Sequence, residues 1–458
     1  MRVLEQKRYS FRVTYPISDI LDKHGFGKVA DVPFIQDSTL NYHQSGSRFL
    51  IDRALAKWPK PAREITPATI KTNAEALCNY LDWCDARTVD PITAEYLPIL
   101  IGRYQREMTE GDWSASGDGL SAVTINQRID VALEFQQWAA YQGLRPEVEV
   151  PTKTITRERR RKGSGGGRKA ESIEVRRGKM RINKRTLGMP SEEAVGAWLQ
   201  RIYLKPVVGG TEGLMCETVL ETAIRRAEVA GLRKDFLPAD PNEWPIVDRA
   251  VAPEHQMVFV TIRYGTKGPK YGTDHGDKIG PEQIIKMPMK LALRLHHYRN
   301  TDRPKAVMVA VKDGKTAAEQ RRIRDNTVHL FINPNNGERY TPSRVYDAWR
   351  SVPLPQRGWS VHSGRDFWAC TTLWRAMVSF KKLFEEALER KLDDMIVSLF
   401  KSTALSVIEL QIQPQLRHVD RDTTMIYLQW IADRLGVALD LHQNYVESLA
   451  TEGDDEEG

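Results

Sequence analysis

Long hydrophobic runs are missing from the 458-residue sequence. Its apolar stretches are a few residues long, whereas a helix that crosses a bilayer needs about 18. The first residues, MRVLEQKRYSFRVTYP, also lack the apolar core of a signal peptide. These absences argue against a membrane or secreted protein, and we expect a cytoplasmic one.

Cysteine is scarce as well, with four residues at positions 78, 84, 216 and 370. Neither a CxxC metal pair nor a disulfide framework is present, so we expect buried thiols. The stretch GSGGGRK lacks the GxxxxGK[ST] spacing of a phosphate loop, and no carboxylate cluster has the spacing of metal ligands. We interpret DHGD at residues 274–277 as a solvated turn. We therefore expect no metal, nucleotide or other cofactor.

Positive charge is concentrated in one place. The net charge is +7, yet residues 151–186 carry 14 Lys and Arg against 3 Glu, and the rest of the chain sums to −4. Because this segment is rich in Gly and has no helical or strand period, we interpret it as a linker. It could be a solvated spacer, but its charge density favours contact with a phosphate backbone. The basic residues expected to bind DNA are Arg159, Arg160, Arg161, Lys162, Arg168, Lys169, Arg176 and Arg177.

The composition, with 41% hydrophobic and 28% charged residues, is typical of a folded protein, and the length suits about three domains. The expected divisions are an N-terminal region of unknown role at 1–60, a helical domain at 61–150, the basic linker at 151–186, a larger domain at 187–446 and an acidic tail at 447–458.

Local signals place several helices and strands. Thr66, followed by Pro67, predicts a helix start, Thr124 predicts another, and Gly143 predicts a stop. The run MVFVTIRY at 257–264 predicts a strand, and EQIIKMPM near Ile284 predicts its hairpin partner. The expected fold class is mostly α with a small β-sheet.

Three short segments of the larger domain combine side chains that suit phosphate chemistry. They are ETAIRRAEVAGL with Arg225 and Glu228, VHSGRDFWACTTL with His362 and Arg365, and LRHVDRDTTMIYLQW with His418 and Tyr427. We expect each of the first two pairs to share a helix face, because its members are three residues apart. Singly these are weak signals, since an Arg or His on a helix is more often a surface charge or a satisfied core group. Their order carries the information: Arg, then Lys267 in a turn after a strand, then HxxR, His and Tyr.

This order resembles that of the tyrosine recombinases, the phage-integrase type of site-specific DNA recombinase. The three segments look like the family's TGLRxSE, HxLRHTFAT and LGHxxxxTTxxY boxes, and the resemblance covers residues 189–427. It implies a two-domain clamp, with a helical core-binding domain and a mixed α/β catalytic domain. The departures are Ala223 where the family usually has Gly, Arg417 in place of the Gly of LGH, and Asp366 where a second His is usual.

The interval of 53 residues between Arg365 and His418 is longer than relatives usually show. The excess near 375–405 has apolar residues at helical spacing and is interpreted as one or two inserted amphipathic helices. These helices could be a local addition to the core or a contact between protomers.

Strand transfer passes through a five-coordinate phosphorus with extra negative charge, and the fixed planar forks of Arg225 and Arg365 suit it. The resemblance implies that Tyr427 is the nucleophile, that His418 donates to the phosphate, and that His362 orients or accepts a proton from the attacking group. Further expected roles are Lys267, its pKa depressed by nearby arginines, as proton donor to the leaving oxygen, with Lys270 as the alternative, and Glu228 as a brace for an Arg or His. Tyr445 is a poorer nucleophile candidate, because no paired His precedes it at the same interval.

The expected function is a site-specific DNA recombinase that cuts and rejoins strands through a 3′-phosphotyrosine intermediate without metal or ATP, so that a mobile element is integrated, excised or transposed. The resemblance also implies double-stranded DNA as partner and a homo-tetramer on two DNA sites, with residues 428–448 as a docking helix. Two alternatives stay open: a type IB topoisomerase or hairpin-forming resolvase, and a DNA-binding regulator that keeps the fold without the chemistry.

Overall fold

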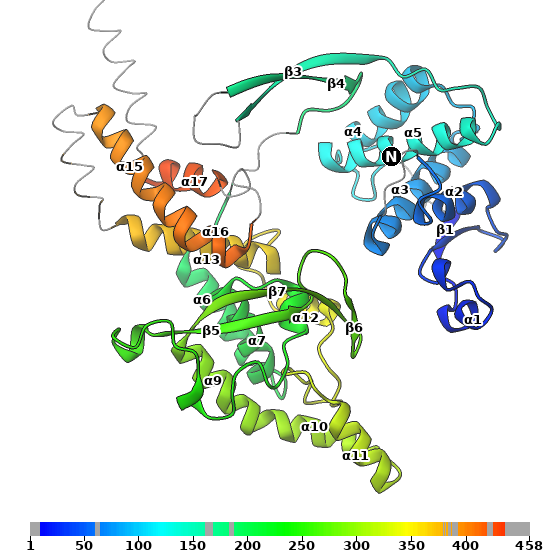
Figure 1. Ribbon diagram of the computed structural model, residues 1–458. Coiled ribbons are helices and arrows are strands. Elements are labelled where there is room, and N and C mark those ends of the chain that lie inside the picture. Colours follow the sequence, from blue (N-terminus) through cyan, green and yellow to red (C-terminus); the bar gives the residue numbers. More distant parts are fainter. Residues whose placement is uncertain are drawn as a thin grey trace, which may run out of the picture. The chain divides into compact units, whose positions relative to one another are not determined.

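The computed structural model describes residues 10–59, 65–160, 168–182, 187–378, 380, 382, 386, 393–418 and 425–435. The chain divides into two compact units, Met1–Lys184 and Arg185–Gly458 (Figure 1). Among the described helices, none combines the length and apolar character that crossing a membrane requires. The expected fold class is confirmed, because both units are mostly helical and carry only small sheets.

The first unit consists of helices, one short sheet near its start and a long hairpin at its end. Its elements are β1 (Phe11–Thr14), α1 (Ser18–Lys23), η1 (Gly27–Val29), β2 (Phe34–Asp37), α2 (Gln44–Ala54), α3 (Pro67–Ala86), η2 (Tyr96–Gln105), α4 (Arg106–Glu110), α5 (Ala122–Tyr141), β3 (Thr152–Arg160) and β4 (Arg168–Arg176).

Capping side chains define the two long helices of this unit. The Thr66 hydroxyl accepts a hydrogen bond from the Thr69 N–H at 3.3 Å, so α3 starts where the sequence predicted. Helix α5 starts earlier than predicted: Ser121 is its cap, and Thr124 donates its N–H to the Ser121 hydroxyl. Gly143 follows the end of α5 at φ +73°, as its predicted role as a stop requires.

Residues 10–59 belong to the core of this unit. Phe49 and Leu50 are fully buried, and Phe49 packs edge-on against Phe135 with 5.6 Å between ring centroids. The Trp138 indole N–H donates to the Asp52 carboxylate at 3.0 Å. The described part of the N-terminal region is therefore an integral layer of the helical unit, and the expected boundary near residue 60 does not separate two cores.

The basic segment forms a hairpin, so the expectation that it has no strand structure is wrong. Strands β3 and β4 pair antiparallel, from Thr152 opposite Arg176 to Arg160 opposite Arg168. Thr and Ile residues at 152–156 and Ile and Val at 173–175 supply β-branched side chains that favour strands. The segment was interpreted from its charge and Gly content, so these strand-favouring residues were given too little weight.

The second unit surrounds a three-stranded antiparallel sheet in the order β5-β7-β6. Its elements are α6 (Glu192–Tyr203), α7 (Gly209–Thr222), α8 (Arg226–Ala230), η3 (Pro241–Glu243), η4 (Pro253–His255), β5 (Met257–Tyr264), β6 (Gly272–Asp274), β7 (Asp277–Pro288), α9 (Met289–Asn300), α10 (Asp302–Lys312), α11 (Ala317–Asn326), α12 (Pro342–Trp349), α13 (Val361–Val378), α15 (Asp393–Val407), η5 (Ile408–Ile412), α16 (Gln413–Leu416) and α17 (Met425–Leu435). The predicted strand is β5, and its predicted hairpin partner lies in β7.

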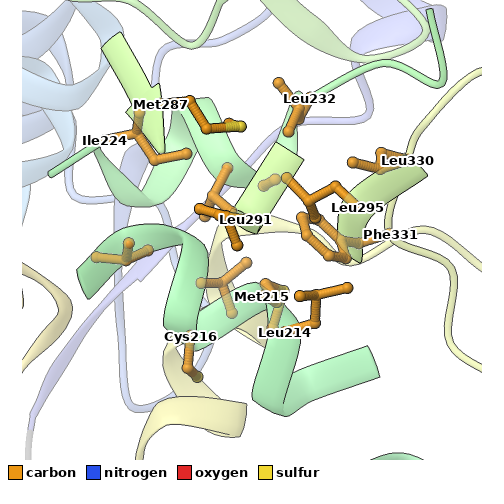
Figure 2. Packing of buried hydrophobic residues seen from close by; sticks show 14 of the residues in the cluster. Leu214, Met215, Cys216, Ile224, Leu232, Met287, Leu291, Leu295, Leu330 and Phe331 are labelled. Carbon is orange, nitrogen blue, oxygen red and sulfur yellow. The ribbon is translucent and has the colours of Figure 1, made fainter. Parts of the chain in front are cut away.

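The sheet buries one face against helices. In β5, Val258, Val260 and Ile262 are buried and alternate with more exposed residues, which is the period of a strand with one covered face. Figure 2 shows Met287 of β7 close to Leu291 of α9, with Met215 of α7 in the same cluster. Each such fully buried side chain stabilises the fold by about 1.5–3 kcal/mol.

A second core lies among the C-terminal helices. Cys370 and Leu373 of α13 pack with Phe400 and Ala404 of α15, and Tyr427 of α17 belongs to the same cluster. The described part of the segment near 375–405 therefore contributes to the local core, as one of the two interpretations expected. The contact between protomers stays a hypothesis, and part of the segment lies outside the described residues.

Candidate active site

Arg225 lies at the start of α8 and is held by Glu228. Its backbone is extended at φ −78° and ψ 157°, so Arg225 caps the helix instead of sharing a helix face with Glu228 as expected. The Arg225 N–H donates to Glu228 Oε2 at 2.7 Å, and its Nη1 donates to Glu228 Oε1 at 2.9 Å. The Glu228 carboxylate thus caps the free backbone N–H of Arg225, as in one half of a capping box, and forms an ion pair with its guanidinium. The expected bracing role of Glu228 thus has a geometric counterpart.

A left-handed residue precedes this cap. Helix α7 ends at Thr222, and Ala223 has φ +53° and ψ 30°. Glycine adopts this conformation freely, whereas other L-residues lose roughly 1–2 kcal/mol in it. The departure at Ala223 therefore retains the backbone conformation that glycine favours, and the Ala223 carbonyl accepts a hydrogen bond from Arg365 Nη1.

Arg365 is 2% exposed and lies in the second turn of α13. Its Nη2 donates to the Leu416 carbonyl at 2.9 Å, and Arg225 Nη2 donates to the same oxygen at 3.2 Å. The two guanidinium groups thus meet at the end of α16. Burial and the nearby Arg225 and Arg417 charges lower the pKa of Arg365 to about 9.

His418 lies two residues after the end of α16. Burial, then the charges of Arg365 and Arg225, lower the pKa of His418 to about 4, so the imidazole is neutral at pH 7. Its Nδ1 is buried and has no hydrogen-bond partner within the described ranges. His362 lies in the first turn of α13, is exposed, and further lowers the pKa of His418 through its charge.

Tyr427 of α17 is 1% exposed, and its hydroxyl donates to Asp366 Oδ1 at 2.8 Å. Burial, then the Asp366 charge, raises the pKa of Tyr427 well above its ordinary value, while the nearby Arg365 acts in the opposite direction. The phenol is therefore protonated and directed at a carboxylate. The structure brings Arg225, Arg365, His418 and Tyr427 together from separate segments of the chain.

Lys267 lies in the loop between β5 and β6 and is exposed, like Lys270. The position of Lys267 in a turn after a strand is confirmed. The role of Lys267 as proton donor to the leaving oxygen stays a prediction.

Two further residues of this site were not assigned a role from the sequence. Asp366 accepts the Tyr427 hydrogen bond, and Arg417 Nη2 donates to Glu228 Oε2 at 2.6 Å. Both occupy positions at which the sequence departs from the family boxes. The signal available in the sequence was a charged residue at a box position where the family usually has His or Gly.

The expected DNA-binding residues separate into groups. Residues 159 and 160 lie in β3, and 168 and 169 lie in β4, whereas Arg161 and Lys162 lie outside the described residues. Arg177 is exposed. The prediction for Arg176 is corrected, because its Nε donates to Asp130 at 2.6 Å and its guanidinium is buried against the helical unit. Arg176 anchors the hairpin.

The DHGD segment forms a turn at His275 and Gly276 as expected, but the expectation that all of it is solvated is wrong for Asp277. Asp277 is buried, and its carboxylate pairs with Arg233 at 2.9 Å and accepts from His329 at 2.6 Å. Arg339 pairs with the other carboxylate oxygen. Asp277 is therefore a structural ion-pair centre that ties β7 to the chain after α8 and α11. Among the described residues, no group of three His, Cys, Asp or Glu side chains is arranged to hold a metal.

Comparisons with known proteins give likenesses of structure only. No protein-family model and no curated protein matches the sequence. The XerH site-specific recombinase bound to palindromic difH substrate in a post-cleavage complex is 12% identical, with a TM-score of 0.45 over 87% of this chain and 89% of that one. The Tn1549 transposon integrase bound to transposon right-end DNA is 12% identical, with a TM-score of 0.42 over 83% and 93%. XerA recombinase is 14% identical, with a TM-score of 0.31 over 85% and 97%. Because these scores are below 0.5, the functional argument rests on the side chains.

Proposed function

We propose that the chain is a site-specific DNA recombinase of the tyrosine recombinase family, which cuts and rejoins DNA through a 3′-phosphotyrosine at Tyr427. The observation that carries this proposal is the meeting of Arg225, Arg365 and His418 beside a buried tyrosine. Arg225, Arg365 and His418 are each more than 50 residues apart in the sequence. Their order along the chain, followed by Tyr427, is the order of the family's boxes.

The site suits a phosphodiester because its positive groups are fixed before substrate arrives. Arg225 is held by Glu228, and Arg365 is held by two backbone carbonyls. Preorganised donors stabilise charge that develops in a transition state without a reorganisation cost. A guanidinium also bonds two phosphate oxygens at once. These properties favour phosphoryl transfer over a purely structural ion-pair cluster.

In the proposed reaction the Tyr427 oxygen attacks the phosphorus, an ester bond to the tyrosine forms, and the bond to the 5′-oxygen breaks. The phenolic proton must leave once the bond to Asp366 has opened, and His362 in the first turn of α13 is the proposed acceptor. The leaving oxygen takes a proton, for which Lys267 is the proposed donor. Because the ester stores the energy of the broken bond, rejoining requires no ATP.

Tyr427 also has to change its hydrogen-bond partner. Its hydroxyl is buried and bonded to Asp366, so it reaches a phosphate only after that bond opens. On this proposal the described arrangement is a resting one, in which the Tyr427 hydroxyl is protected until its bond to Asp366 opens. We propose that DNA binding or docking of a neighbouring protomer opens it, which couples cleavage to assembly.

The proposed partners are double-stranded DNA and further copies of this chain. The helical unit and the second unit would hold the duplex as a clamp, with the basic hairpin β3–β4 following the phosphate backbone. Four protomers on two DNA sites would act two at a time, in the cytoplasm, on the ends of a mobile element.

A nicked duplex that contains the sequence bordering the gene tests this proposal. Cleavage close to the nick releases a short fragment, so the covalent adduct cannot rejoin. We expect wild type to form a protein–DNA adduct that survives detergent and Tyr427→Phe to form none while binding DNA equally. DNA binding without an adduct from either protein would favour the regulator. Relaxation of supercoiled plasmid by monomers without recombinants would favour the topoisomerase.

A further inference from the structure

Arg417 stands between α16 and His418 in a left-handed conformation, with φ +55° and ψ 46°. Its side chain is 8% exposed and lies beside Glu228, to which Nη2 donates at 2.6 Å. A surface arginine would extend into solvent from this position. Arg417 instead places a full charge inside the site that already contains Arg225 and Arg365.

Several nitrogen atoms of this cluster are buried and have no hydrogen-bond partner among the described residues. Within the part of the chain that the structure describes, Arg417 Nε and Nη1, Arg365 Nε and His418 Nδ1 have no hydrogen-bond partner. Buried polar groups are normally satisfied, so four unmet nitrogen positions on three neighbouring side chains need an explanation. An acceptor with several oxygens would satisfy them together.

The cluster of Arg225, Arg365 and Arg417 also has more positive charge than Glu228 can balance. Glu228 is the carboxylate that contacts both Arg225 and Arg417, while Arg365 is bonded to backbone carbonyls. Burial, and then the charge of neighbouring arginines, lowers the pKa of both Arg365 and Arg417, while Glu228 acts in the opposite direction. An anion placed among the three guanidinium groups would remove this repulsion.

We propose that Arg417 is a third guanidinium donor to the reacting phosphate and a catalytic residue that the usual glycine at this position cannot supply. This inference rests on the proposed function and deepens it. Three forks around one phosphorus would bind the diester and stabilise the extra negative charge of the five-coordinate state. Glu228 positions two of the three.

The alternative is that Arg417 only braces Glu228. Both roles require a buried arginine, but they differ in what the free nitrogens do. A brace uses Nη2 alone, whereas a phosphate donor uses Nε and Nη1, which face no acceptor in the described structure. An anion-binding measurement therefore separates the two.

The first experiment measures sulfate binding without catalysis. We expect sulfate to raise the melting temperature of wild type more than chloride at equal ionic strength, and Arg417→Gly to weaken the apparent sulfate affinity by about tenfold. Glycine suits the left-handed backbone here, so the variant should fold. Arg357→Gly, which removes an exposed charge in a turn, is the matched control and should bind sulfate as wild type does. Equal sulfate affinity of wild type and Arg417→Gly would overturn the inference.

The second experiment measures adduct formation on the nicked duplex. We expect Arg417→Gly to react about 100-fold more slowly than wild type, with DNA affinity nearly unchanged, because one transition-state donor is lost. Added guanidinium ion at non-denaturing concentration should restore part of the rate in Arg417→Gly and leave wild type unaffected. An unchanged rate, or a slow variant that guanidinium does not rescue, would assign Arg417 to bracing and overturn the catalytic role. If wild type itself forms no adduct, the recombinase proposal fails, and the sulfate experiment still decides whether Arg417 belongs to an anion site.

Discussion

At the scale of single residues, the guanidinium groups of Arg225 and Arg365 both donate a hydrogen bond to the Leu416 carbonyl oxygen. This carbonyl is the last of α16, where the helix dipole is negative and cations are favoured. The residue that ends the helix thus holds both arginines, and the next two residues contribute Arg417 and His418. The site depends on a few backbone atoms as much as on side chains.

In the proposed reaction the planar guanidinium of Arg365 binds the phosphate, so Arg365→Lys should reduce adduct formation by at least about 100-fold while leaving DNA affinity within about threefold. A lysine keeps the charge but cannot bond Ala223 and Leu416 and a phosphate in one plane. Adduct yield on the nicked duplex and a gel-shift titration measure the two effects. Arg375→Lys, on the exposed part of the same helix, is the control. An adduct yield for Arg365→Lys close to that of wild type contradicts the argument.

His418 should make the fold sensitive to mild acid. Its folded pKa of about 4 lies below the ordinary value, so the unfolded chain binds the proton more readily. The contribution of neutral His418 to stability is complete above pH 6.5 and is lost as the pH falls towards 4. From pH 7 to pH 5 we expect wild type to lose about 1 kcal/mol more than His418→Gln, after allowance for solvent screening. Urea denaturation at both pH values measures this difference, and parallel losses would refute the pKa shift.

At the scale of helices and strands, regular hydrophobic patterns were predictable and unusual local conformations were not. Strand β5 alternates cleanly and was predicted to the residue. The hairpin β3–β4 was missed because its charges outweighed its β-branched residues, and the start of α5 was missed because Ser121 and Thr124 are both good caps. The order of motif residues identified Arg225, Arg365, His418 and Tyr427 as site candidates.

The partners of these residues depend on packing between distant segments, which a single sequence does not contain. The bond between Asp366 and Tyr427 joins α13 to α17, and the bond between Arg417 and Glu228 joins the end of α16 to α8. The members of each pair are far apart in the sequence. Ala223 and Arg417 adopt left-handed conformations without being glycine, so the sequence did not mark these two turns.

The hairpin should contribute a salt-dependent part of DNA affinity. The backbone register sets Arg159 opposite Lys169 and Arg160 opposite Arg168, so four basic residues lie at paired positions of the hairpin. Replacing all four by Gln should reduce the slope of log affinity against log salt by about 3 to 4, because each phosphate contact releases about 0.9 counterion. Replacing four basic residues in and before α11 (Lys315, Arg321, Arg322 and Arg324) by Gln is the charge-matched control. Equal slopes for the two variants would remove the hairpin from the interface.

At the scale of the whole molecule, the proposed chemistry is contained in one of the two units. Every residue of the arginine cluster and Tyr427 lies in Arg185–Gly458, whereas the basic hairpin lies in Met1–Lys184. Cleavage and a large part of backbone binding are thus assigned to different units. Deletion of the first unit should weaken DNA binding and leave the geometry of the arginine cluster unchanged.

The molecule should cleave DNA in the presence of EDTA. In the proposed mechanism three arginines take the place of the divalent ions of nucleases, so we expect adduct yield in EDTA to stay within about twofold of the yield in Mg²⁺. A metal-dependent nuclease on the same duplex verifies that chelation is complete. Loss of the adduct in EDTA, with recovery on adding Mg²⁺, would show that the guanidinium cluster is insufficient.

The most direct test of the central claim is to identify the atom that holds the DNA. The adduct from the nicked duplex is trimmed with nuclease and protease and sequenced by mass spectrometry, and the released strand is tested for a free 5′-hydroxyl by enzymatic phosphorylation. We expect a nucleotide joined through its 3′-phosphate to Tyr427 and a free 5′-hydroxyl on the other strand end. Attachment to any other residue, including Tyr445, or through a 5′-phosphate, would contradict it.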